Sequence, residues 1–356
     1  MTMNLTLYIT EDCDLDCVYC TQKKKPAVMS EEVLRRACEL AFSDGGSAGL
    51  CFFGGEPLLC EDMIFEAMDI CGLLSEKYGK PVYYRMTTNG TLLTERMLER
   101  AAAEGMEIAL SFDGLMQDIC RKYRSGRGTF ADVEAAAKRL LAVLPASTAM
   151  MTAAPQAVGR FAASVRYLYD IGFQRIHAVP AYGSKVQWVP SAQEILAGQM
   201  AEAADFYKKC LLDGDPFYFS PIETKIRSLL SGINVNDRCH LGFSQMPVAT
   251  DGNIYACNQF MGDADYCLGN VYDGIFVRKC ATLAFRRKLP LSCQSCSFKS
   301  RCLNSCGCLN RLETGREDTV SPFQCSYEKM LIHLADETAA DLRTADTTGF
   351  ESYFGH

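Results

Sequence analysis

Three cysteines close to the N-terminus have a spacing that suits an iron–sulfur cluster. Cys13, Cys17 and Cys20 form a C-x3-C-x2-C loop directly after an apolar run at residues 5–10. Three thiolates from one loop can bind three irons of a [4Fe–4S] cube and leave the fourth iron for substrate or cofactor atoms, whereas an electron-transfer cluster usually takes a fourth cysteine. A zinc site is the alternative, although zinc would need a fourth ligand nearby.

Glycines and a carboxylate follow at the end of the second apolar run, residues 49–54. Gly54 and Gly55 lack a side chain, so the backbone can approach a ligand closely, and the Glu56 carboxylate can accept hydrogen bonds from an ammonium group. A simple turn is the alternative for this segment. Its position after a three-cysteine loop favours ligand binding.

Polar side chains also end the third and fourth apolar runs, residues 82–88 and 108–113. Asn89, Ser111 and Asp113 could hydrogen-bond a ribose or a carboxylate. Asn-Gly and Asp-Gly are also good turn formers, so turn chemistry alone could explain two of these segments.

Together with Tyr19 directly before Cys20, the cysteine loop and the Gly54–Pro57 segment resemble the radical S-adenosylmethionine (SAM) superfamily. The resemblance implies that the loop binds the catalytic cluster and that Glu56 meets the methionyl amino group. It also places Arg124 near the SAM carboxylate, with a solvated basic patch as the alternative.

A second set of cysteines lies in the C-terminal third of the chain. Seven of them follow a regular order, with Gly252 five residues before the second: Cys239, Cys257, Cys293, Cys296, Cys302, Cys306 and Cys325. Seven thiolates are too many for one four-coordinate site, so the spacing indicates two clusters. A pair of zinc knuckles is the alternative.

This order resembles the SPASM domain, an auxiliary-cluster extension of certain radical SAM enzymes. By that resemblance one cluster is held by Cys293, Cys296, Cys302 and Cys325, and the other by Cys239, Cys257 and Cys306. We expect the fourth iron site of the latter to be open to substrate. Cys210 or Cys267 could fill it instead, and Cys308 is a further candidate ligand beside Cys306.

The elements that must position these residues form an α/β pattern. Six short β-rich runs alternate with amphipathic helical stretches over residues 1–215, which predicts a parallel sheet with functional residues at its C-terminal rim. We predict a partial (β/α)6 TIM-type barrel at 1–215 and a linker at 216–238. A Cys-rich SPASM domain with little regular structure follows at 239–325, then a C-terminal helix and tail at 326–356.

Composition excludes several classes of protein. The chain has 356 residues with a formal net charge of −7, which gives no basic surface for nucleic acid. No run reaches the roughly 18 apolar residues that span a bilayer, and the N-terminus does not read as a signal peptide. We therefore expect a cytoplasmic protein without nucleic-acid or membrane partners. In that compartment the 19 cysteines would not form a disulfide framework.

The resemblance implies an anaerobic catalyst with SAM and three [4Fe–4S] clusters. In such enzymes the reduced cluster cleaves SAM to methionine and a 5′-deoxyadenosyl radical, which abstracts hydrogen from the substrate. Relatives with the auxiliary domain mostly modify ribosomally made peptides, so we predict formation of a thioether or carbon–carbon crosslink, or related chemistry. The expected partners are a precursor peptide and an electron donor such as flavodoxin or ferredoxin.

Two other functions stay open. One is oxidation of a protein Ser or Cys side chain, or of a small molecule, as in sulfatase maturation. Those relatives carry an aspartate base directly after the cysteine equivalent to Cys257, where this chain has Asn258. The other is a zinc-stapled scaffold without catalysis. Twelve residues precede Cys13, so a leader peptide would be held by the barrel, the SPASM surface or a separate leader-binding protein.

Overall fold

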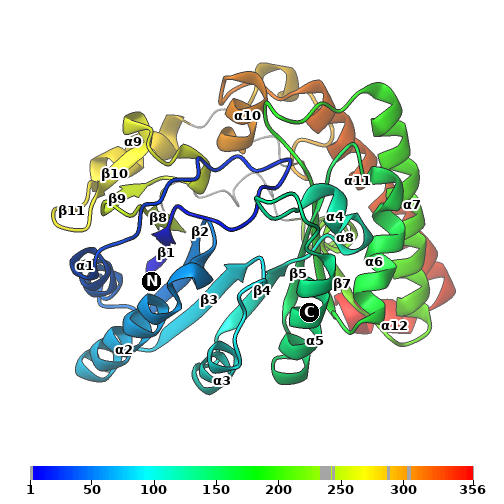
Figure 1. The fold of residues 1–356 in the computed structure, drawn as a ribbon. Coiled ribbons are helices and arrows are strands. Elements are labelled where there is room, and N and C mark those ends of the chain that lie inside the picture. Colours follow the sequence, from blue (N-terminus) through cyan, green and yellow to red (C-terminus); the bar gives the residue numbers. More distant parts are fainter. Residues whose placement is uncertain (1–2, 233–241, 243–244, 287–288, 303–305, 356) are drawn as a thin grey trace.

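One curved sheet with helices along its outer side forms the body of the molecule (Figure 1). The computed structural model describes residues 3–232, 242, 245–286, 289–302 and 306–355. Eleven strands are described: β1 (Met3–Thr10), β2 (Ala48–Gly54), β3 (Val82–Thr88), β4 (Glu107–Ser111), β5 (Thr148–Ala153), β6 (Arg175–Pro180), β7 (Tyr218–Phe219), β8 (Met246–Val248), β9 (Asn253–Tyr255), β10 (Cys267–Asn270) and β11 (Gly274–Ile275).

The first seven strands pair in parallel and in sequence order, so each connection crosses over the same side of the sheet. β8 pairs with the other edge of β1, also in parallel, with Leu5 opposite Met246. β9, β10 and β11 then continue the sheet in antiparallel pairs. The sheet ends at β7 on one side and β11 on the other, which makes it a partial barrel rather than a closed one.

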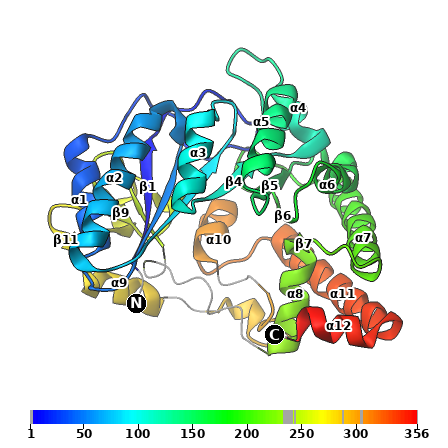
Figure 2. The same cartoon turned by 90° about the horizontal axis from the view of Figure 1, so that it is seen from below.

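Helices cover the outer side of the parallel part, as Figure 2 shows from below. The described α-helices are α1 (Glu31–Ala41), α2 (Glu61–Tyr78), α3 (Glu95–Glu104), α4 (Gln117–Cys120), α5 (Phe130–Val143), α6 (Phe161–Asp170), α7 (Pro190–Leu212), α8 (Ser220–Ser231), α9 (Val277–Arg286), α10 (Gly307–Thr314), α11 (Pro322–Ala345) and α12 (Thr347–Phe354). Local signals set their ends: the Ser30 hydroxyl accepts from the N–H of Val33 at the start of α1, and Gly105 ends α3 in a left-handed conformation.

The predicted α/β fold and partial barrel are confirmed, but two segments are more regular than the sequence indicated. Within the predicted linker 216–238, residues 218–231 form β7 and α8 and complete the barrel edge. β7 has only two residues, and α8 buries the charged residues Glu223 and Lys225, so neither element has a clear apolar pattern.

The end of the chain is also helical rather than a tail. α12 begins at Asp346, whose carboxylate accepts from the N–H of Gly349, and it buries Phe350 and Phe354 one turn apart. α11 begins at Pro322, so Cys325 lies in its first turn. The boundary expected at residue 326 therefore falls inside a helix.

Candidate active site

The three-cysteine loop leaves the C-terminal end of β1 and lies along the segment that follows α4. The N–H of Asp16 donates to the carbonyl of Lys122, and the N–H of Val18 donates to that of Cys120. Leu15 and Tyr123 form an antiparallel bridge in the same stretch. These backbone bonds fix the loop over the rim of the sheet, where the sequence predicted it.

The thiols of this loop lie near one another and are costly to ionise without a cation. Burial raises the pKa of Cys13 to about 12, with smaller effects of the same sign from Asp14, Glu56 and Cys17. Burial also raises the pKa of Cys17. Iron supplies the positive charge that a buried thiolate needs, so this donor set fits a cluster. No three His, Cys, Asp or Glu side chains of the described residues converge closely enough for a single metal ion.

The two glycines where β2 ends, Gly54 and Gly55, pack against the start of the cysteine loop. Gly54 has a φ of +138°, and a Cβ on either glycine would collide with a carbonyl oxygen, that of Thr10 for Gly54 and that of Asp12 for Gly55. The N–H groups of Gly55 and Glu56 donate to these same oxygens, at 2.9 and 2.8 Å. The glycines therefore let β2 dock onto the start of the cysteine loop; backbone approach to a ligand stays a prediction.

Glu56 is buried at the junction of β2 and β3. Its carboxylate accepts from the Thr88 hydroxyl at 2.6 Å, from the Asn89 N–H at 2.7 Å and from the Leu58 N–H at 3.1 Å. Burial raises its pKa to about 7, against the opposing effect of these hydrogen bonds. A carboxylate has about four lone-pair sites, so these donors leave capacity for one more, as an ammonium group would require.

Asn89 connects the end of β3 to the cysteine loop. Its amide nitrogen donates to Asp14 at 2.8 Å, and its amide oxygen accepts from the N–H of Thr91 at 2.9 Å. The Thr91 hydroxyl donates to the other Asp14 oxygen at 2.6 Å. Asp14, the residue after Cys13, is thus clamped by β3, a contact that the sequence analysis did not anticipate.

Asp113 holds Tyr19 in place, and its contact with SAM stays a prediction. Its side chain is fully buried and accepts from the Tyr19 hydroxyl at 2.5 Å, from Arg121 Nε at 3.0 Å and from the Thr152 N–H at 2.8 Å. The Arg121 guanidinium also lies 5.3 Å from the centre of the Tyr19 ring. Tyr19 is therefore held by buried partners and anchors the loop beside Cys20.

Two arginines contact the loop in different ways, Arg121 through Tyr19 and Arg124 through Asp12 and the carbonyl of Asp14. Arg121 is buried, whereas the Arg124 side chain is 51% exposed and forms an ion pair with Asp12. Both belong to the sequence Arg-Lys-Tyr-Arg, and the sequence alone could not tell which one turns inward. Ser111 ends β4 at the rim, half-buried and opposite Met150 of β5. Contact of Arg124 or Ser111 with SAM stays a prediction.

Cys293, Cys296 and Cys325 lie together where α11 begins. Burial is the main cause that raises the pKa of Cys293, and the nearby sulfurs of Cys325 and Cys296 add to it while Lys329 opposes it. Cys325 stands in the first turn of the 24-residue helix α11, whose dipole favours a thiolate there. Cys302 is buried at the end of the same Cys-rich stretch. The arrangement agrees with the expected ligand set without testing it.

Cys257 and Cys306 also meet, and Cys308 lies with them. The sulfurs of Cys306 and Cys308 are 3.3 Å apart. A hydrogen bond with Cys308 lowers the pKa of Cys257, and hydrogen bonds with Cys257 and Cys306 raise that of Cys308. Cys239, the third expected ligand, lies outside the described residues.

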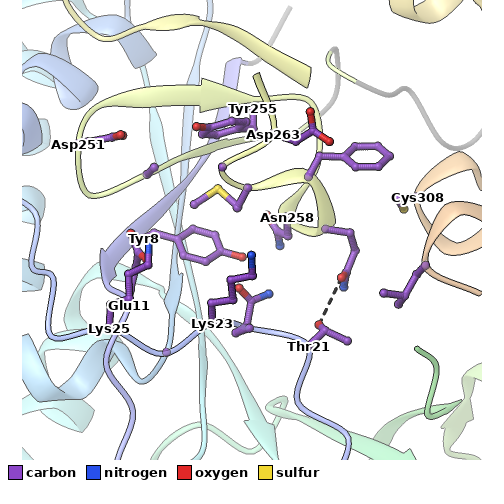
Figure 3. Close-up of a pocket in the computed structure, with 18 of the residues that line it drawn as sticks. Tyr8, Glu11, Thr21, Lys23, Lys25, Asp251, Tyr255, Asn258, Asp263 and Cys308 are labelled. Atoms are coloured by element: carbon purple, nitrogen blue, oxygen red, sulfur yellow. Dashed lines mark hydrogen bonds and ion pairs between the residues drawn. The ribbon is translucent and has the colours of Figure 1, made fainter. Parts of the chain in front are cut away.

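A pocket of about 740 Å³ is lined by residues that directly follow Cys20 and by Cys308 of α10 (Figure 3). Its walls come from β1, from the loop just after Cys20, and from the segment between β9 and β10, with α10 at one end. Polar side chains that line it include Tyr8, Glu11, Thr21, Lys23, Asn258, Gln259 and Arg311.

The polar groups of the pocket leave binding capacity. The Tyr8 hydroxyl is buried and has no hydrogen-bond partner of regular geometry among the described residues, with the Gln22 side chain as a polar neighbour. Lys23 has no ion-pair partner in the described part of the chain, whereas Lys25 pairs with Glu11 at 3.6 Å. Figure 3 shows Tyr8, Lys23 and Asn258 turned toward the same space.

Residues 7–162 match the family model described as "Radical SAM superfamily", so this part of the chain is a radical SAM domain. The relatives extend the likeness. A Cysteine-type anaerobic sulfatase-maturating enzyme from Clostridium perfringens is 24% identical over 343 residues, which covers 86% of this chain and 88% of that enzyme. An uncharacterised protein from Methanocaldococcus jannaschii is 30% identical over 132 residues, and the match spans 45% of its length.

Solved structures share the fold of both halves. Native anSMEcpe with bound AdoMet and a Cp18Cys peptide superposes with a TM-score of 0.81 at 20% identity, covering 96% of this chain and 99% of that one. Streptococcus suis SuiB bound to its precursor peptide SuiA gives a TM-score of 0.62 at 16% identity, covering 91% and 76%. No α-helix of the described residues is long and apolar enough to cross a membrane.

Proposed function

We propose that this protein is a radical SAM enzyme that modifies a ribosomally synthesised peptide, by a thioether or carbon–carbon crosslink or by related hydrogen abstraction. The observation that carries the proposal is the pocket lined by Thr21, directly after Cys20, by Gly55 and by Cys308. A substrate there would lie next to the segment that follows the three-cysteine loop and next to a C-terminal cysteine.

The residues of the rim fit the cofactors that the family uses. Cys13, Cys17 and Cys20 would hold a [4Fe–4S] cluster, and the rim formed by Gly54–Glu56, Asn89, Ser111 and Arg124 would hold SAM. When bound, cluster and SAM supply a 5′-deoxyadenosyl radical that removes a hydrogen atom from the substrate. The chain contributes orientation: Asp113 and Arg121 hold Tyr19, and Asn89 and Thr91 hold Asp14 on the other side of Cys13.

Two auxiliary [4Fe–4S] clusters would be held by the C-terminal cysteines, giving three clusters per chain. These clusters would accept the electron that the substrate loses when it is oxidised. An electron donor such as flavodoxin or ferredoxin would reduce the catalytic cluster, and the precursor peptide is the expected partner. A separate leader-binding protein would present that peptide if the chain's own surface does not.

The polar lining of the pocket suits a peptide. Asn258 and Gln259 offer side-chain amides, which match the donors and acceptors of a peptide backbone. The hydroxyl of Thr21 donates to the side-chain oxygen of Gln259 at 3.3 Å. A bound peptide could replace this hydrogen bond with one to each of the two side chains. Lys23 adds a cation for a carboxylate of the substrate.

Oxidation of a Cys side chain is the second candidate, favoured by the likeness to the Clostridium maturating enzyme over 86% of the chain. Asn258 argues against it, because an amide cannot accept a proton as the aspartate of those relatives would. The Asn258→Asp variant tests this difference directly.

The first test is anaerobic reconstitution followed by counting of iron and of 5′-deoxyadenosine. We expect about twelve irons per chain, falling to about eight in the Cys13→Ala/Cys17→Ala/Cys20→Ala variant, with formation of 5′-deoxyadenosine only in the former. Iron near four per chain would remove the auxiliary clusters from the proposal. Zinc without iron would overturn it entirely.

The second test identifies the product. The enzyme is incubated with SAM and dithionite, together with either a display library of cysteine-containing peptides or the Cp18Cys peptide, and products are read by mass spectrometry. Library products that have lost two hydrogens and carry an internal crosslink support peptide maturation. An aldehyde formed from the cysteine of Cp18Cys by the natural chain, in the absence of crosslinks, would favour the second candidate.

A further inference from the structure

The second cysteine of the Cys306-Gly307-Cys308 sequence lies between two thiols that the sequence assigns to an auxiliary cluster. Cys306 directly precedes α10, and Cys308 is the second residue of that helix. The Cys308 sulfur lies 3.3 Å from that of Cys306 and shares a hydrogen bond with Cys257, which comes from the segment after β9. Cys308 is buried, whereas Cys257 and Cys306 are half-buried.

The contact between Cys308 and Cys257 is enforced by a polar clamp. Arg311 is one turn along α10 from Cys308, on the same face of the helix. It forms an ion pair with Asp263 at 2.7 Å, and its guanidinium lies 4.9 Å from the centre of the Tyr266 ring. Asp263 and Tyr266 belong to the same segment, between β9 and β10, that carries Cys257. The clamp therefore fixes the helix face with Cys308 against Cys257.

The other cysteines that could supply an additional ligand lie elsewhere. Cys210 is near the end of α7, close to Tyr169 of α6 and to Asp215. Cys267 begins β10, opposite Tyr255, and its thiol donates to the carbonyl of Gly269 at 3.3 Å. Of the three candidates, Cys308 is the one whose sulfur meets two other cysteine sulfurs.

We propose that Cys308 is a ligand of the auxiliary cluster that Cys257 and Cys306 bind, so that the start of α10 supplies two thiolates, one from the residue before the helix and one from its second residue. This assignment rests on the proposed auxiliary clusters. On ligation the Cys308 sulfur gives its proton to solvent and forms a bond to iron, with no change of oxidation state. Because Cys308 lines the pocket, the cluster borders the space proposed for the substrate.

The experiment starts from the Cys13→Ala/Cys17→Ala/Cys20→Ala chain, in which the iron that remains belongs to the auxiliary clusters. Cys308→Ala is added to it, with Cys267→Ala as the matched control for a neighbouring half-buried cysteine. Iron is counted after anaerobic reconstitution, and the reduced proteins are compared by electron paramagnetic resonance. We expect about eight irons in the parent and in the control, and about four in the Cys308→Ala chain, with loss of one of two cluster signals.

Retention of about eight irons and of both signals, unchanged, in the Cys308→Ala chain would overturn the assignment. If that chain loses all its iron, Cys308→Ser decides, because it preserves the size of the side chain. A lost or shifted signal of one cluster in the serine chain supports ligation, and two unchanged signals contradict it. A parent without iron would instead contradict the proposed auxiliary clusters, which is a different failure.

Discussion

The barrel and the Cys-rich stretch at residues 289–302 are held together by different forces. All residues of β1 from Leu5 to Thr10 are buried, and the strand lies between β2 and β8. In residues 289–302, all of which are described, Pro290 and Cys302 are the buried ones, and Leu291 is 85% exposed. Apolar burial contributes about 25 cal/mol per Å², so it stabilises the first region strongly and the second very little.

The difference shows where cysteines serve structure and where they serve chemistry. In the barrel, the three-cysteine loop is attached to a framework with a large apolar core of its own, through hydrogen bonds that involve Asp14, Tyr19 and the backbone. In the Cys-rich stretch, few apolar contacts exist, so cross-links through metal and ion pairs must replace them. Removal of the cysteine ligands should therefore destabilise the Cys-rich stretch and leave the strands of the barrel as stable as before.

The largest expected effect is on the local stability of the Cys-rich stretch. Cys293→Ala/Cys296→Ala should speed amide exchange across residues 289–302 by several orders of magnitude, because metal binding supplies folding free energy where few apolar side chains are buried. Cys13→Ala/Cys17→Ala should abolish cleavage of SAM yet leave exchange in β2 and β3 unchanged. Hydrogen exchange with mass spectrometry on anaerobic samples measures both. If exchange across residues 289–302 were equally slow in the two double variants, metal binding would not be what stabilises the Cys-rich stretch.

The next effect concerns the buried ion pair that joins the two regions. Lys225 of α8 lies 2.7 Å from Glu328 of α11, and both side chains are 5% exposed. Lys225 also donates to the carbonyl of Arg301, the neighbour of Cys302. Lys225→Met should lower the free energy of unfolding by about 3–5 kcal/mol, because it removes the cation that faces a buried carboxylate.

Urea unfolding of the natural chain and the variant measures that loss. The double variant Lys225→Met/Glu328→Leu should recover much of it, since no unpaired charge remains. Lys209→Met, which removes a solvent-exposed pair with Asp213, is the control and should have no measurable effect. A double variant as unstable as the single one would show that packing, rather than charge, joins the regions here.

The smallest effect is a pH dependence that belongs to the barrel alone. The folded-state pKa of Glu56, about 7, lies above the model value of 4.5, so the folded chain binds its proton more tightly than the unfolded one. Stability from this group is present below pH 4.5 and is lost as the pH rises to about 7, by about 3 kcal/mol in all.

Glu56→Gln should remove that part of the pH dependence, because an amide stays neutral. Denaturant unfolding at about pH 5 and about pH 8 gives the slope for both chains. Glu107→Gln serves as a control, since its carboxylate is 72% exposed and pairs with Arg85 on the surface. An unchanged slope in the Glu56→Gln chain would show that the carboxylate is ionised throughout this range.

The sequence predicted the barrel well because buried parallel strands read as apolar runs. The expected run 82–88 coincides with β3, and the expected run 49–54 lies within β2. The short strands β7 and β8 are set by pairing with β6 and β1, which are distant in sequence. The local sequence pattern of so short a strand does not show which strand it will pair with.

The site was predictable in residue type more than in role. The cysteine loop and the Gly-Gly-Glu segment lie together at the rim as expected. Asp113 was expected to meet SAM because it follows a strand, but its burial beside Arg121 could be seen only once Tyr19 and α4 were placed. The position of Cys308 beside Cys257 could not be predicted either, because it depends on the ion pair between Arg311 and Asp263, which are far apart in the sequence.

The parallel pairing of β8 with β1 has a consequence for protein engineering. Leu5 and Leu7, a few residues before the cysteine loop, lie opposite Met246 and Val248 in the parallel pairing of the two strands. A chimaera that exchanges everything after residue 232 for the corresponding part of a relative would therefore replace the neighbour of β1 as well. Such grafts should keep residues 246–248 with the host and join the donor after them, so that the strand that carries the loop retains its own register.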